Sequence, residues 1–125
     1  MDEERAAKNL IVELTLEFSY LIMDYCDQLE AARKYNLANP LFRSGTAIGA
    51  LVREAQNSES KADFIHKLKI AAKEGDETEY WLLLARKVKN APPAEILFEK
   101  LKSINRILNR IIATSKSGTG FRYRS

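Results

Sequence analysis

An apolar repeat between residues 61 and 90 constrains the fold more than any other feature of the sequence. Seven positions alternate spacings of four and three residues: Phe64, Leu68, Ala71, Gly75, Thr78, Leu82 and Ala85. This spacing places all seven on one face of a helix, as in the seam of a coiled coil. The small residues Ala71, Gly75 and Thr78 would let another backbone approach closely. The pattern therefore predicts a long helix from Lys61 to Asn90 that packs tightly on a neighbour.

Three further segments show the same helical period. The first runs from Glu4 to Tyr35, and its apolar stripe comprises Leu14, Phe18, Leu21, Tyr25, Leu29 and Ala32, with Ile11 and Ile22 widening it. The second runs from Pro40 to Asn57, with an apolar face of Ile48, Val52 and Ala55, and Leu41 and Leu51 beside them. The last ends at Thr114 and carries Leu97, Leu101, Ile104, Leu108 and Ile111. Because alternating β-branched residues are almost absent, the periodicity predicts an all-α fold.

Cap and breaker residues separate these helices by short connections. Asn39 can cap the second helix, and Pro40 suits its first turn. Ser60 and Asp63 resemble a capping pair at the start of the third helix. The stretch "NAPPAE" separates the third helix from the fourth. Four amphipathic helices with short connections predict an up-down-up-down four-helix bundle.

The length of 125 residues fits a single domain. We expect the bundle to cover residues 1–117 and a flexible basic tail to follow over residues 118–125. No apolar run approaches the length of a membrane span, and the acidic start "MDEERAAKNL" differs from a secretory signal. We therefore expect a cytoplasmic protein with no membrane partner. Cys26 is the single cysteine, and we expect it to be a small buried hydrophobe.

The stretch "FRSGTAIGALVREAQ" raises the question of a phosphate-binding loop. Gly45 and Gly49 lie four residues apart, with no strand before them and no third glycine after them. A dinucleotide-binding fingerprint needs all of these, and a phosphate loop needs a Gly-Lys-Ser/Thr ending that is missing here. A spacing of four places both glycines on one helical face. We interpret the stretch as a contact surface between helices.

Candidate catalytic and metal-binding groups are few. Asp63 and His66 form one Asp-x-x-His pair, but His66 is the only histidine, so a di-metal centre would lack half its ligands. Glu74, Glu77 and Glu79 form an acidic group beside Lys73, for which pairing on a helix surface is the simpler explanation. No nucleophile-elbow motif is present. We expect no catalytic residue, no metal and no cofactor.

Charge is distributed unevenly along the chain. Residues 1–60 hold ten acids and six bases, a net charge of −4, whereas residues 61–125 hold seven acids and fourteen bases, a net charge of +7. No acid follows Glu99. We predict a nucleic-acid-binding surface on the last helix and tail, where Phe121 and Tyr123 are interleaved with the bases. Its residues are Lys102, Arg106, Arg110, Lys116, Arg122 and Arg124. An ordinary solvated face remains the alternative.

The stretches "RSGTAIGALVREAQ" and "SKADFIHKLKIAAKEGDETEYWLLLA" resemble a family of bacterial four-helix bundle proteins. The family includes proteins encoded in intervening sequences of large-subunit ribosomal RNA genes and, more distantly, the accessory variability determinant of diversity-generating retroelements. The resemblance covers residues 9–114. It implies a four-helix bundle, assembly into a pentameric ring and association with nucleic acid. For the retroelement branch it also implies a reverse transcriptase partner.

The positions that match the family motif are expected to serve packing or subunit contacts. They are Arg43, Ser44, Ile48, Gly49, Glu54, Ala55, Phe64, Leu68, Ala71, Glu77 and Trp81. We assign the same role to Gly45 and Gly75.

Two functions from different classes follow. The first is a non-enzymatic homo-oligomer that binds structured RNA or DNA through its basic helix and tail. The second is a scaffold or accessory subunit that docks a protein partner such as a reverse transcriptase. An enzyme would instead need a deep polar pocket around Glu54, Glu74 and Glu77 that holds a metal.

Overall fold

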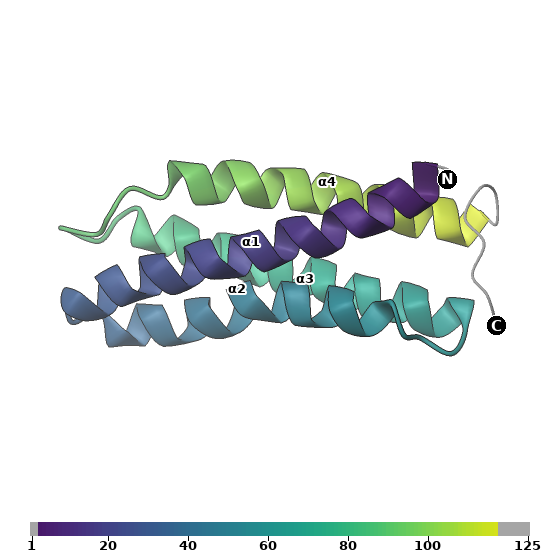
Figure 1. The fold of residues 1–125 in the computed structure, drawn as a ribbon. Helices are drawn as coiled ribbons and strands as arrows, with labels where there is room; N and C mark the ends of the chain where they lie inside the picture. The colour runs from purple at the N-terminus through teal and green to yellow at the C-terminus, as the bar shows by residue number, and fades with distance from the viewer. Residues whose placement is uncertain (1–2, 118–125) are drawn as a thin grey trace.

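The computed structural model of the chain describes residues 3–117, which form four helices. In chain order these are α1 (Glu3–Ala31), α2 (Tyr35–Ala55), α3 (Lys61–Ala85) and α4 (Glu95–Ser117). Successive helices run in opposite directions side by side (Figure 1). Each helix packs on the next, and α1 also packs on α4, which closes the bundle. The predicted all-α, up-down-up-down bundle is confirmed, with no strand among residues 3–117.

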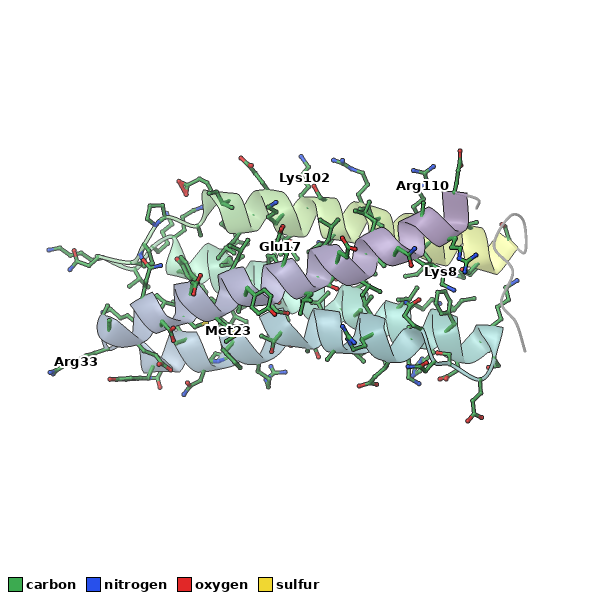
Figure 2. All side chains as sticks on the ribbon, in the orientation of Figure 1. Lys8, Glu17, Met23, Arg33, Lys102 and Arg110 are labelled. Atoms are coloured by element: carbon green, nitrogen blue, oxygen red, sulfur yellow. The ribbon has the colours of Figure 1, made fainter. Side chains whose placement is uncertain are left out.

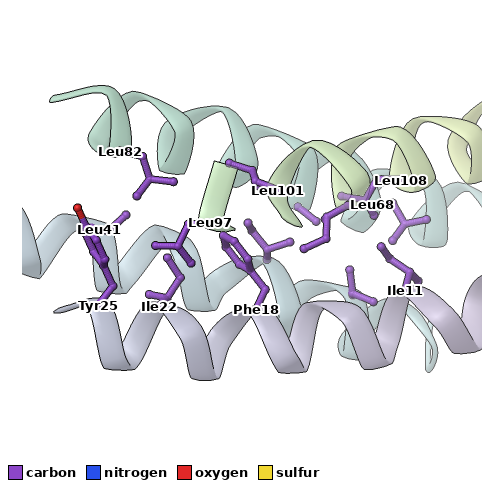
Figure 3. Packing of buried hydrophobic residues seen from close by; sticks show 14 of the residues in the cluster. Ile11, Phe18, Ile22, Tyr25, Leu41, Leu68, Leu82, Leu97, Leu101 and Leu108 are labelled. Atoms are coloured by element: carbon purple, nitrogen blue, oxygen red, sulfur yellow. The ribbon is translucent and has the colours of Figure 1, made fainter. Parts of the chain in front are cut away.

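The seam predicted for α3 is the face that this helix buries. All seven of its positions are buried, and so are the five predicted for α4, which Ile112 and Ser115 extend. Side chains from all four helices meet along the bundle axis, including Phe18, Leu41, Leu68 and Leu101 (Figure 3). Burial of this apolar surface is the main source of stability for such a bundle.

The buried stripe of α1 differs from the predicted one. Its centre is formed by Ile11, Thr15, Phe18, Ile22, Tyr25 and Leu29, whereas Leu14 and Leu21 lie half-buried on the flank. Thr15 faces the core because its hydroxyl donates a hydrogen bond to the Ile11 carbonyl (2.8 Å), so no polar group is left unsatisfied. A pattern built from apolar residues does not include such a threonine. The predicted stripe therefore contained Leu14 and Leu21 in place of Thr15 and its buried neighbours.

The break between the first two helices comes earlier than predicted. α1 ends at Ala31 rather than Tyr35, and α2 begins at Tyr35, so Asn39 is no cap and Pro40 lies inside the helix. Arg33 makes the turn with a left-handed φ of 63°. Pro40 donates no helical hydrogen bond, but the loss falls near the exposed start of α2.

The later helix ends also differ from the predicted ones. α3 ends at Ala85 rather than Asn90, where the connection has a left-handed φ of 70°, and α4 continues past Thr114 to Ser117. The Tyr25 hydroxyl holds the connection by donating to the Pro92 carbonyl (2.8 Å). The predicted Ser60 cap is confirmed, because its hydroxyl accepts a hydrogen bond from the Asp63 N–H (3.0 Å).

Glycines mark the closest approaches between helices. A Cβ atom at Gly45 would lie 2.8 Å from Ile22 of α1, and one at Gly49 would lie 3.1 Å from the Thr15 carbonyl oxygen. Both glycines therefore let α2 lie directly against α1. Cys26 is buried, as predicted. Within residues 3–117, no helix combines the length and the apolar character that crossing a membrane requires.

Candidate nucleic-acid interface

The predicted basic residues of α4 lie on its outer face. Lys102, Arg106 and Arg110 are exposed and recur every fourth residue; the first and last of them are labelled in Figure 2. None of the three forms an ion pair with a carboxylate of the described residues. Lys100, by contrast, turns toward α1 and pairs with Glu17 at 3.2 Å. The outer row of cations, which we call the α4 ridge (Lys102, Arg106 and Arg110), is therefore not neutralised by carboxylates of the described bundle.

Lys116 continues the basic surface into the last turn of α4, where it meets Lys69 of α3. Both side chains are exposed. The positive charge of Lys116, together with side-chain contact between the two residues, lowers the pKa of Lys69. The predicted residues Arg122 and Arg124, and the aromatic residues Phe121 and Tyr123, lie outside the described residues.

Lys69 is a member of this surface that the sequence analysis missed. In the sequence it stands in the middle of "HKLKIAAK", far from the basic end. Only the antiparallel packing of α3 on α4 brings it beside Lys116. The informative signal was the position of Lys69 outside the predicted seam of its helix, combined with the extension of α4 to Ser117, past the predicted end at Thr114.

The start of α1 adds further cations to the same end of the bundle, because α1 begins where α4 ends (Figure 1). The Lys8 ammonium lies 5.2 Å from the centre of the Phe64 ring. Partial burial, and to a lesser extent the charge of Arg5, lowers the pKa of Lys8. Lys8 and Arg110 lie at this end in Figure 2. The antiparallel helix dipoles oppose each other, so the side chains determine the sign of the local potential.

Two members of the acidic group of α3, Glu74 and Glu77, pair with α2. Arg43 forms ion pairs with Glu77 and with Glu74, the latter at 3.8 Å. The indole N–H of Trp81 donates to the same Glu77 carboxylate (3.3 Å). These contacts give Glu74 and Glu77 a structural role in joining the two helices. Among residues 3–117, no cluster of three or more His, Cys, Asp or Glu side chains is placed to hold a metal.

Two buried hydroxyl groups complete the contact between α2 and α3. The Thr78 hydroxyl donates to the Glu74 carbonyl (2.7 Å) and lies 3.0 Å from the Ser44 hydroxyl. Both residues are fully buried. The pair satisfies polar groups that would otherwise be costly inside the bundle.

The residues expected to serve packing or subunit contacts fall into three groups. Those buried inside the bundle are Ser44, Gly45, Ile48, Ala55, Phe64, Leu68, Ala71 and Gly75. Gly49, Glu77 and Trp81 are half-buried. Arg43 and Glu54 are exposed, and Glu54 is not part of the cluster formed by Arg43, Glu74 and Glu77.

A shallow groove runs between the outer sides of α1 and α2. It encloses about 190 Å³ and is lined by Val12, Leu16, Ser19, Gly49, Ala50 and Arg53. Tyr20 and Met23 of α1 are also exposed. The α1–α2 groove is therefore an apolar surface with a cation, Arg53, among its lining residues.

Comparison with known proteins places this fold among relatives. Residues 7–112 match the model of a family described as 23S rRNA-intervening sequence protein. A crystal structure of a protein of unknown function from the S23 ribosomal protein family of Bacteroides thetaiotaomicron VPI-5482 is similar, with a TM-score of 0.82 and 38% identity. The match covers 86% of this chain and 99% of that one. Among curated proteins, none matches the chain significantly.

Proposed function

The chain belongs to the family of 23S rRNA-intervening sequence proteins, and we propose that it is a non-enzymatic, cytoplasmic homo-oligomer that binds nucleic acid. The binding surface in this proposal is the α4 ridge, continued by Lys116 and the basic tail. We name structured RNA as the first ligand because the family description refers to 23S rRNA.

The observation that carries the proposal is the α4 ridge without carboxylate partners among the described residues. A solvated helix ordinarily mixes charges of opposite sign, because such pairs four residues apart stabilise it. Lys67 and Asp63 of α3 form such a pair, with the ammonium 2.9 Å from a carboxylate oxygen. The ridge departs from this pattern over its whole length. Cations held on a rigid helix and free of carboxylates are suited to contact phosphate groups.

Self-association is the second part of the proposal, and the occupant we propose for the α1–α2 groove is another copy of this chain. The charge distribution supports this, because residues 1–60 carry a net charge of −4 and residues 61–125 a net charge of +7. Opposite halves of two copies therefore attract each other. Exposed apolar side chains also lie on α3, at Tyr80, Leu83 and Leu84. A contact between two different faces of this kind can close into a ring, and a pentamer is the number that the family resemblance implies. A ring would repeat the ridge and strengthen weak phosphate contacts through avidity.

Salt dependence tests the binding proposal. Anisotropy of a labelled RNA hairpin should report tight binding at low salt, weakening by roughly 0.9 logarithmic units per tenfold rise in salt for each phosphate contacted on a duplex. Binding that is absent at low salt, or that does not respond to salt, would refute the proposal.

A further inference from the structure

We propose that the outer face of α1 in one copy of the chain packs in parallel on the outer face of α3 in a second copy. The inference rests on the self-association in the proposed function, and it names the two surfaces that meet. The α3 helix of the second copy would then cover the α1–α2 groove.

The outer face of α1 carries an exposed apolar centre between two carboxylates. Leu16, Tyr20 and Met23 are all exposed, and Glu13 and Asp27 are exposed on either side of them along the helix. The successive spacings are three, four, three and four residues, which place all five side chains along one line of the helix. We call this line the α1 outer stripe (Glu13, Leu16, Tyr20, Met23 and Asp27). A line of exposed apolar side chains is typical of a surface that a partner covers.

The outer face of α3 repeats the same spacing, with bases at its ends. Tyr80 and Leu83 form its exposed apolar centre, and an edge contact with the Trp81 ring, at 5.5 Å between ring centres, supports the Tyr80 ring. The last member lies in the turn directly after α3, where its N–H still donates to the Leu84 carbonyl (3.1 Å). The α3 outer stripe comprises Lys73, Asp76, Tyr80, Leu83 and Lys87, all of them exposed.

The two outer stripes cannot meet within one chain. α1 and α3 each pack on α2 and on α4, so they lie diagonally across the bundle (Figure 1). Their outer faces therefore point away from each other, and every copy offers both stripes to its neighbours. A contact between two different surfaces of this kind adds further copies until the ring closes.

The charges at the ends of the two stripes are complementary. Glu13 and Asp27 stand 14 residues apart on the first stripe, and Lys73 and Lys87 stand 14 residues apart on the second. None of the four forms an ion pair with another residue of the range 3–117. When the tyrosines at the two centres lie opposite each other, each acid faces a lysine. The contact would therefore bury apolar side chains at its centre and gain an ion pair at each end.

A further pair of charges selects the parallel orientation. In that orientation Asp76 of the second copy lies opposite Leu16, which lines the α1–α2 groove together with Arg53. Neither Asp76 nor Arg53 forms an ion pair within the described bundle, so the two can pair across the contact. In the antiparallel orientation Asp76 would lie opposite the apolar side chain of Met23, and a charge that is buried without a partner is costly.

Charge exchange in the full chain tests the pairing, with the mass measured by light scattering coupled to size exclusion. Glu13→Lys, Asp27→Lys places lysines opposite lysines and should raise the dissociation constant of the oligomer about a hundredfold or more. Lys73→Glu, Lys87→Glu should do the same, because it places carboxylates opposite carboxylates. The quadruple variant joins both pairs of changes in one chain and leaves the net charge at +3. It should recover the mass of the parent oligomer, because each acid again faces a base.

Glu59→Lys, Glu99→Lys is the matched control for Glu13→Lys, Asp27→Lys. Both control positions are exposed and lie outside the two stripes, and the change in net charge is the same. The dissociation constant of the control should change less than about threefold. An equal loss of association in the two double variants would mean that net charge alone acts, and would contradict the pairing. Because every altered residue is exposed, circular dichroism should show that the variants fold like the parent chain.

Disulfide cross-linking in a Cys26→Ala background tests the orientation. Leu16→Cys with Asp76→Cys should link neighbouring copies under oxidising conditions, because the parallel contact places these positions opposite each other. Leu16→Cys with Leu83→Cys would link copies in the antiparallel contact. Linking through the Leu83→Cys pair, or through neither pair while the oligomer persists, would overturn the proposed contact.

The outcomes separate this contact from the self-association on which it rests. Loss of the oligomer in both double variants, with recovery in the quadruple variant, supports the pairing. If the parent is an oligomer and Glu13→Lys, Asp27→Lys keeps its mass, or if the quadruple variant stays dissociated, the pairing is wrong and self-association remains. If the parent chain is a monomer at micromolar concentration, both fail, and the hairpin assay still decides nucleic-acid binding by the α4 ridge.

Discussion

Gly75 of α3 and Asn105 of α4 lie so close together that a side chain at Gly75 would meet Asn105 first. The ideal Cβ position is 2.7 Å from Oδ1 of Asn105 and 3.7 Å from Cδ1 of Leu101. Oδ1 of Asn105 is itself buried, with no hydrogen-bond partner among the described residues. The two helices therefore meet at a point where there is little room for any larger group.

We expect Gly75→Leu to destabilise the bundle by about 1–3 kcal/mol, because overfilling a packed contact forces neighbouring side chains out of their preferred positions. Urea unfolding measures the change. Lys73→Leu places the same side chain on an exposed position of the same helix and should alter the free energy of unfolding by less than about 0.5 kcal/mol. Equal stability of Gly75→Leu and the parent chain would mean that α3 and α4 do not meet closely at this point.

The buried face of α3 was predictable from the sequence because nothing competes with its period. Phe64, Leu68 and Leu82 are large and apolar, and the small residues between them keep the same spacing. On α1 the same reasoning failed at Thr15, whose hydroxyl is satisfied by the backbone of its own helix. An apolar pattern selects residues by side-chain type alone. Whether a polar side chain can be buried depends instead on whether its polar atom forms a hydrogen bond inside the fold.

Helix ends and contacts between helices were harder to predict than helix faces. The break after α1 is made by a left-handed Arg33, which composition does not reveal, whereas Pro40 is accommodated inside α2. The ridge could be predicted because its members recur within one helix. Lys69 could not, because its meeting with Lys116 depends on the packing of α3 against α4. A site formed between helices requires the register between them, which one-dimensional spacing does not contain.

We expect the double variant Arg106→Glu, Arg110→Glu to weaken RNA hairpin binding at 50 mM salt by about a hundredfold or more, because it replaces two attractions with two repulsions. The matched control is Lys89→Glu with Lys87→Glu, which makes the same change in net charge on the exposed connection after α3. An equal loss in both variants would indicate that only net charge matters.

The same variant separates nucleic-acid binding from the scaffold alternative. If Arg106→Glu, Arg110→Glu retains its oligomeric mass and its cellular function but no longer binds RNA, the chain acts by docking a protein partner. If function is lost together with binding while the oligomer persists, nucleic-acid binding is the activity on which the cell depends.

Self-association through the α1–α2 groove predicts a specific effect of Leu16→Glu. A carboxylate at this position must be desolvated when a second copy covers the groove, so the oligomer should dissociate toward the 14.2 kDa chain. Light scattering coupled to size exclusion measures the mass. Leu10→Glu is the matched control, because Leu10 is exposed to 46% and Leu16 to 44%, but Leu10 does not line the groove. A parent chain that is monomeric at micromolar concentration would refute self-association itself.

The hydroxyl pair between α2 and α3 predicts a coupling between Ser44 and Thr78. Thr78→Val keeps the shape of the side chain but removes a buried group 3.0 Å from the Ser44 hydroxyl, and should destabilise the bundle by about 1–2 kcal/mol. In a Ser44→Ala background the same change should cost less, since the partner is already absent. Equal costs in both backgrounds, measured by urea unfolding, would show that the two hydroxyls do not interact.

Cys26 should be unreactive toward thiol reagents until the bundle opens. Its Sγ atom lies 3.5 Å from the Ala38 carbonyl oxygen, and burial, followed by the charges of Glu30 and Asp27, raises the pKa of the thiol from 9.0 to about 12. The thiolate is the reactive form, so a rise of that size lowers its fraction at pH 8 by roughly a thousandfold. Labelling with a chromogenic disulfide at pH 8 should be slow in buffer and rapid in concentrated urea.

A variant that carries Ser103→Cys on the exposed side of α4, in a Cys26→Ala background, should react rapidly under both conditions. Rapid labelling of the parent chain in buffer would mean that the contact between α1 and α2 around Ala38 opens readily.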